Sequence, residues 1–175
     1  TSKDAVELVK GMLFKGATIT RGGSESVKES GIFDLINCGD YNFLDRTKKG
    51  ITPEEEMQSY KETVGGDFYF CSANAVTRDG QIVNIDGYSN RISAIAFGPK
   101  KVIMIVGKNK IVNDLGEATV RIKSVASPKN CVRLNKNTPC AKLGKCICIK
   151  DNYTPQIFEG CASPDRICRN VLISG

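Results

Sequence analysis

Five of the eight cysteines gather in the last quarter of this 175-residue chain. Four thiolates can hold a tetrahedral Zn²⁺ ion or an iron–sulfur cluster. The spacing is neither the paired C-x₂-C of a zinc ribbon nor a ferredoxin run, so reduced or adventitiously paired thiols are the alternative. The five are Cys140, Cys146, Cys148, Cys161 and Cys168. The other three cysteines, Cys38, Cys71 and Cys131, are expected to be small core residues.

The chain contains no histidine. This excludes Ser-His-Asp and Cys-His catalysis and every His-ligated metal site. A bound metal would therefore take cysteine, carboxylate, carbonyl or water ligands. A cysteine nucleophile would lack its usual base, so we do not expect covalent thiol catalysis.

A glycine turn offers a first candidate ligand site. Gly22, Gly23 and Ser24 follow a short apolar strand and precede a helix. Backbone N–H groups and a hydroxyl at such a turn can hold a phosphate or carboxylate, and Arg21 could add charge. An ordinary strand-to-helix turn with a serine cap is an equal alternative. The turn is not a dinucleotide or Walker motif, so no nucleotide cofactor is predicted.

A second candidate lies further along the chain, where Asn74 follows a predicted strand and Asp86, Asn90 and Arg91 surround the next turn. Polar groups in these places can converge on a ligand. Asp86 could act as a general base or pair with Arg91. Asn and Asp next to Gly also satisfy local turn hydrogen bonds, and the residues alone favour that structural role.

The elements that position these residues alternate between helix and strand, which predicts an α/β domain with a mostly parallel sheet and helices on both faces. Asp79-Gly80 predicts an antiparallel hairpin. Residues 102–106 form an unbroken apolar run, the best candidate for a central strand. A helix capped at Asp114 is expected to end before Pro128, and Ser163-Pro164 is expected to begin a short helix that carries Cys168.

Charge and hydropathy limit the partners. The net charge is +6 with lysines in scattered pairs, and no basic block alternates with aromatics, so we expect no nucleic-acid binding. No apolar run reaches membrane-spanning length, and residues 1–10 have an amphipathic helical pattern rather than a signal peptide. We expect a cytoplasmic protein of one domain, residues 1–175, with reduced thiols and a Cys-rich subregion at 138–170.

Several segments in order resemble the LUD family, the lactate-utilisation-type proteins. They are residues 22–24, 41–46, 72–77, 79–80, 83–87, 89–91, 97–101, 107–110, 138–140, 144–146 and 163–168. The resemblance implies a fold similar to the sugar-isomerase and CoA-transferase-like α/β proteins, with a Cys-rich C-terminal extension. Members of the lactate-utilisation type take part in oxidising L-lactate to pyruvate together with iron–sulfur partner proteins.

The resemblance also selects residues. It favours Cys140, Cys146, Cys161 and Cys168 as metal ligands for zinc or an iron–sulfur cluster, although residues 147–160 look like an insertion that adds Cys148. It favours Gly22, Gly23, Ser24, Asn74, Asp86, Asn90 and Arg91 as ligand-binding residues in one pocket.

Two functions from different classes follow. The first is a component of lactate (2-hydroxy acid) utilisation that binds a small anion and works with an iron–sulfur or other redox partner protein, since no flavin or nicotinamide motif is present. The second is a metal-binding accessory or interaction protein without a reaction of its own. A third possibility, an isomerase or transferase, rests on fold analogy alone. Whether the chain is an enzyme stays open.

Overall fold

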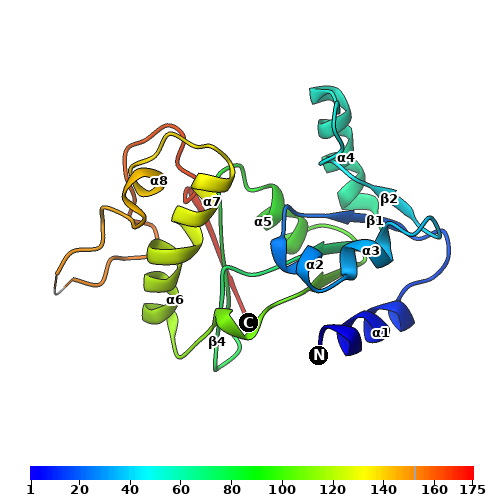
Figure 1. Cartoon of the computed structure of the whole chain (residues 1–175), viewed down its shortest axis with the longest axis horizontal. Coiled ribbons are helices and arrows are strands. Elements are labelled where there is room, and N and C mark those ends of the chain that lie inside the picture. Colours follow the sequence, from blue (N-terminus) through cyan, green and yellow to red (C-terminus); the bar gives the residue numbers. More distant parts are fainter. Residues whose placement is uncertain (152) are drawn as a thin grey trace. The chain divides into compact units, whose positions relative to one another are not determined.

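The computed structural model describes residues 1–151 and 153–175 and is α/β throughout. The chain forms two compact units. Unit 1 comprises residues 1–72 and 93–106, and unit 2 comprises residues 73–92 and 107–175. The chain passes from one unit to the other more than once, so neither unit is a continuous stretch of sequence (Figure 1).

Unit 1 is built on a four-stranded parallel sheet in the order β2-β1-β3-β6. Its strands are β1 (Thr18–Arg21), β2 (Asn42–Leu44), β3 (Phe68–Cys71) and β6 (Lys101–Met104). Its helices are α1 (Ser2–Met12), α2 (Glu25–Glu29), α3 (Ile32–Ile36) and α4 (Pro53–Gly65), and α5 (Asn90–Ala96) crosses the boundary between the units.

Alternation along β3 gives this sheet two apolar faces. Phe68 and Phe70 pack with residues of α1, α2 and α3 in the main core. Tyr69 and Cys71 point to the other face, where they pack against Ala94 of α5. The prediction of a parallel sheet with helices on both faces is therefore correct for unit 1.

A capping box at Thr52 begins α4. The Thr52 hydroxyl accepts a hydrogen bond from the Glu55 backbone N–H at 3.2 Å, and the Glu55 carboxylate accepts one from the Thr52 N–H at 2.7 Å. Pro53 occupies the first turn, where no N–H donor is needed. These contacts explain why α4 begins where it does.

Unit 2 contains a mixed sheet in the order β7-β4-β5-β8. Its strands are β4 (Ala75–Thr77), β5 (Ile82–Asp86), β7 (Ile111–Val112) and β8 (Asn170–Ser174). The predicted hairpin is confirmed, because β4 and β5 are antiparallel and Gly80 has a φ of +96°. The remaining elements of the unit are η1 (Lys108–Lys110), α6 (Leu115–Arg121), η2 (Ile122–Ala126), α7 (Ser127–Arg133) and α8 (Pro139–Leu143).

The helix that begins after Asp114 does not end before Pro128, as the sequence predicts. It continues through the π-helical turn η2 into α7, and the three segments form one coil in Figure 1. Pro128 lacks an N–H donor and would break an ordinary α-helix. Here it falls in the first turn of α7, directly after the π turn has interrupted the α-helical pattern, so the coil tolerates it.

Three other expectations differ from the structure. The chain has a parallel sheet and a separate mixed sheet rather than one mostly parallel sheet. The apolar run at 102–106 supplies β6, which lies at an edge of its sheet and not at the centre. Residues 163–168 form turns and no helix, although the Ser163 hydroxyl accepts a hydrogen bond from the backbone N–H of Asp165 at 3.2 Å, as a helix cap would.

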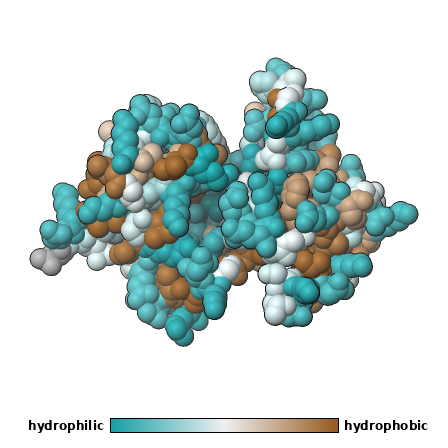
Figure 2. Space-filling model, viewed as in Figure 1, coloured by the Kyte–Doolittle hydropathy of each residue, from teal (hydrophilic) through white to brown (hydrophobic). Residues whose placement is uncertain are grey.

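Among the helices in the described part of the chain, none is both long enough and apolar enough to cross a membrane. On the face shown in Figure 2, hydrophobic residues occur as separate patches between hydrophilic ones.

Candidate metal and ligand sites

Five cysteines of unit 2 line one small cavity, with a volume of about 10 Å³. They are Cys131 of α7, Cys140 of α8, Cys146 just after α8, and Cys161 and Cys168 from the segment before β8. A volume of this size holds roughly one water molecule or one ion. The structure thus brings together thiols that are up to 37 positions apart in the sequence.

Local structure around α8 explains how two of these thiols reach the cavity. Thr138 caps the helix, since its hydroxyl accepts from the Ala141 N–H at 3.3 Å, and Gly144 ends it with a φ of +75°. The Thr138 hydroxyl is also 3.3 Å from the Cys140 sulfur. Beyond the helix, the Cys146 N–H donates to the Lys123 carbonyl at 3.0 Å, which fixes Cys146 against η2.

Burial favours the protonated form of two of the cavity thiols, Cys131 and Cys168. Burial raises the pKa of Cys131 to about 11, and burial likewise raises the pKa of Cys168. All eight cysteines are free thiols. A metal ion would displace the protons, because the thiolate is the form that binds metals.

The sulfur atoms line the cavity without forming a finished ligand set. In residues 1–151 and 153–175, no group of three or more His, Cys, Asp or Glu side chains is arranged to hold a metal ion. The donor chemistry suits zinc, since every candidate ligand is a thiol, but the side chains would have to rotate inward on binding.

The four cysteines that the family resemblance favours all line this cavity, and the fifth cysteine of the cluster, Cys148, does not. The sequence missed Cys131. It stands on a helix with no motif around it, and it is fully buried, as a core cysteine would be. Only the fold shows that its helix faces the Cys-rich tail.

The glycine turn of unit 1 is tightly built. The Ser24 hydroxyl accepts from the Val27 N–H at 3.3 Å, so it caps α2. Gly22 donates to the Phe70 carbonyl at 2.9 Å, and a Cβ at Gly22 would lie 2.9 Å from the Tyr69 hydroxyl oxygen. Glycine is therefore required for the close approach of this hydroxyl to the turn.

The neighbouring Arg21 is almost fully buried and is held within unit 1. Its guanidinium donates to the Thr47 hydroxyl at 2.6 Å, pairs with Asp45 at 3.3 Å and lies 4.6 Å from the centre of the Phe33 ring. Burial lowers the pKa of Arg21, and the Asp45 carboxylate opposes that shift. The Arg21 charge is thus balanced locally.

The second candidate group forms a hydrogen-bonded network in unit 2. Arg91 donates to Asp86 at 2.7 and 3.1 Å and to the Asn74 side-chain oxygen at 2.6 Å. The other Asp86 oxygen accepts from the Ile92 N–H at 2.8 Å, in the first turn of α5. Asn90 is the first residue of α5 and is partly buried. The expected pairing of Asp86 with Arg91 is present.

Gly22, Gly23 and Ser24 belong to unit 1, and Asn74, Asp86, Asn90 and Arg91 belong to unit 2. The expectation that they line one pocket stays a prediction.

These features define an α/β protein with a thiol-lined cavity in its second unit. The chain belongs to the LUD family, since the family model for the LUD domain matches residues 1–174, essentially the whole chain. The match bears out the family resemblance noted in the sequence and suggests a relation to lactate utilisation. A comparison with curated proteins finds no match.

Proposed function

We propose that this LUD-family chain binds a single zinc ion through the thiols of unit 2, and that it serves lactate (2-hydroxy acid) utilisation as a metal-containing component. The observation that carries the metal proposal is the convergence of five buried or half-buried cysteines on one cavity. The proposed ligands are Cys140, Cys146, Cys161 and Cys168. The fifth cysteine of the cavity, Cys131, could replace one of them as a ligand.

The size of the cavity favours one ion over an iron–sulfur cluster. A volume of about 10 Å³ accepts one atom-sized body. A four-iron cluster has eight inorganic atoms and would require the surrounding segments to separate. A single Zn²⁺ ion with sulfur ligands at about 2.3 Å occupies far less space, so it requires a smaller rearrangement of the cysteine side chains. Zinc would then hold α7, α8 and the tail together as a structural centre.

The role in lactate utilisation rests on family membership.

The proposal that unit 1 binds a small anion is supported by the topology of its sheet. In the order β2-β1-β3-β6, the chain goes from β1 to β2 on one side of β1. It then crosses to β3 on the other side of β1 and continues outward to β6, so the direction of winding changes between β1 and β3. Ligands of open α/β sheets bind at such a switch point, at the carboxyl ends of the strands, where Gly22 follows β1.

Elemental analysis of protein purified without oxygen, with a visible spectrum, tests the metal proposal. We expect about one zinc ion per chain and no absorbance at wavelengths longer than the ultraviolet band of the protein itself. Iron with acid-labile sulfide and a brown colour would overturn zinc and favour a redox centre. Metal-free protein with paired cysteines would overturn the metal proposal. Calorimetric titration with L-lactate, with chloride as the control anion, tests the second part, and a lack of heat would refute it.

A further inference from the structure

A buried lysine borders the cysteine cavity. The Lys123 side chain is 2% exposed and is one of the largest fully buried side chains in the described residues. It stands on η2, the π-helical turn between α6 and α7, and it lines the same cavity as the five thiols. Its ammonium donates to the Glu159 carbonyl. π-Helical turns of this kind occur frequently at functional sites.

No carboxylate among the described residues forms an ion pair with this ammonium, although the Lys123 charge, after the hydrogen bonds from Tyr153 and Gln156, helps to lower the pKa of Glu159. The carboxylate of Glu159 instead accepts from the Gln156 N–H at 2.9 Å and from the Tyr153 hydroxyl. Buried charges in proteins are paired or lie beside metal sites, because an isolated one is costly.

A second cation borders the same space. Arg166 lines the cavity and donates to the Cys161 carbonyl at 3.1 Å, and it too has no carboxylate partner among the described residues. Two positive side chains therefore line the same cavity as five cysteines. A zinc ion on four thiolates is a dianion, so it would match both charges.

We infer that Lys123, together with Arg166, is the built-in counter-charge of an anionic metal–thiolate centre in unit 2. The inference rests on the proposed zinc site and adds the residues that set its affinity. Lys123 is a positioning residue and not a ligand: its positive charge would offset the negative charge of a metal–thiolate centre in the cavity that it lines. The hydrogen bond to the Glu159 carbonyl holds the charge in place.

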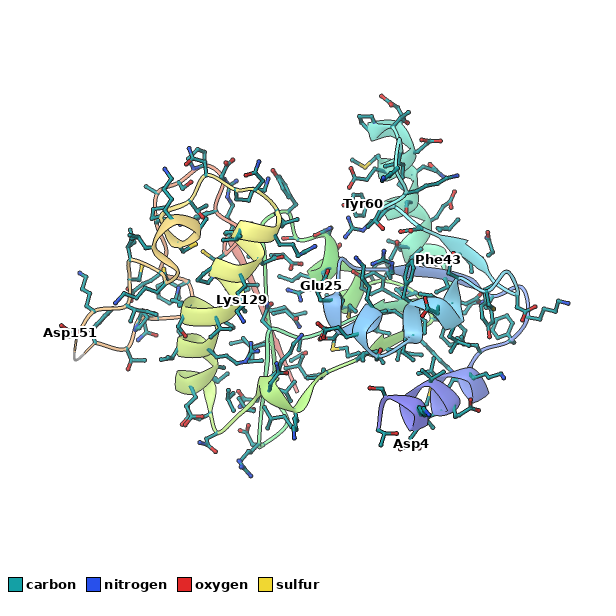
Figure 3. The ribbon with its side chains drawn as sticks, in the orientation of Figure 1. Asp4, Glu25, Phe43, Tyr60, Lys129 and Asp151 are labelled. Carbon is teal, nitrogen blue, oxygen red and sulfur yellow. The ribbon has the colours of Figure 1, made fainter. Side chains whose placement is uncertain are left out.

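The test compares the intact chain with four variants, each reduced, stripped of metal and titrated with Zn²⁺ against a coloured chelator. K123M removes the charge and keeps an apolar side chain of similar length, K123R keeps the charge, and R166Q removes the second charge. K129M is the matched control, since Lys129 is exposed on α7 (Figure 3).

We expect K123M to bind zinc roughly tenfold to a hundredfold more weakly, as is usual when a group that supports metal ligands is lost. R166Q should weaken binding in the same direction, and K123R and K129M should stay close to the unmodified chain. Without metal, K123M should unfold at the same denaturant concentration or a higher one, since it no longer buries an unpaired charge.

Equal zinc affinity of K123M and the unmodified chain would overturn the inference and leave the zinc proposal intact. A K123M protein that is destabilised equally with and without zinc would show that the lysine is structural, which also overturns it. If K123M does not fold, R166Q provides the test, and a zinc affinity of R166Q equal to that of the unmodified chain would refute the role of these side chains as a counter-charge. An unmodified chain that takes up no zinc would overturn the zinc proposal itself, and the counter-charge with it.

Discussion

Removing the Asp86 carboxylate should destabilise unit 2 strongly. Asp86 and Arg91 are 9% and 18% exposed at their side chains, and their closest N–O distance is 2.7 Å. D86A would leave the largely buried Arg91 guanidinium without the Asp86 carboxylate. Breaking one side of such a pair costs about 3–5 kcal/mol. Because Arg91 keeps its bonds to Asn74 and to the Ile85 carbonyl, we expect the lower end, about 3 kcal/mol.

Matched variants separate the charge from the shape. D86N retains an acceptor for Arg91 and should cost less, about 1–2 kcal/mol. R91M removes the cation. The double variant D86A/R91M should therefore lose less free energy of unfolding than D86A and R91M lose in sum, with a difference of about 1.5–3 kcal/mol.

Urea unfolding followed by far-ultraviolet circular dichroism measures these differences, with the midpoint shifting and the slope unchanged. The interpretation of the pair as a structural clamp on the first turn of α5 would be refuted if D86A unfolded within about 0.5 kcal/mol of the unmodified chain. Asp86 would then be available for the predicted ligand.

Three further perturbations test other parts of the structure. T52A should lower the free energy of unfolding by about 1 kcal/mol through loss of the α4 cap, with T52S as control; equal unfolding midpoints would contradict the cap. G22A should be destabilised by the clash of its Cβ with the Tyr69 hydroxyl, and Y69F should relieve this; additive effects would argue against the contact. The hydrogen bond from Lys100 holds the pKa of Asp67 below its usual value. The Asp67 carboxylate therefore stabilises the fold at pH values above its pKa in the unfolded chain, and this stabilisation is lost as the pH falls through its pKa in the folded chain. An acid unfolding curve of D67N that overlays that of the unmodified chain would refute this.

Much of the local structure could be predicted because it depends on neighbouring residues. The Asp79-Gly80 hairpin and the helix capped at Asp114 each follow from side chains a few positions apart, and both are present. The division into two sheets could not be predicted this way. It depends on β8, at the end of the chain, pairing with β5 along Ile82–Asp86.

The candidate metal site shows the same limit. Five cysteines stand out by their concentration in the last quarter of the chain, and the family resemblance selects four of them, Cys140, Cys146, Cys161 and Cys168. Cys131 and Lys123 come from a helix whose sequence shows no motif, and their place at the cavity depends on how that helix packs. From the sequence alone, Lys123 would be predicted to lie on the surface, because most lysines in proteins are exposed.

The π turn between α6 and α7 has a consequence for insertions and deletions. A π turn closes its hydrogen bonds over five residues where an α turn uses four, so it accommodates one extra residue within a single wide turn. Deleting one residue within Ile122–Ala126 would therefore allow a regular α-helix while α7 and Cys131 keep nearly their present orientation. A one-residue deletion within α7 ahead of Cys131 has no such turn to absorb it and would rotate that thiol by about 100°, so the coil from Leu115 to Arg133 tolerates a change of length at the π turn and not beyond it.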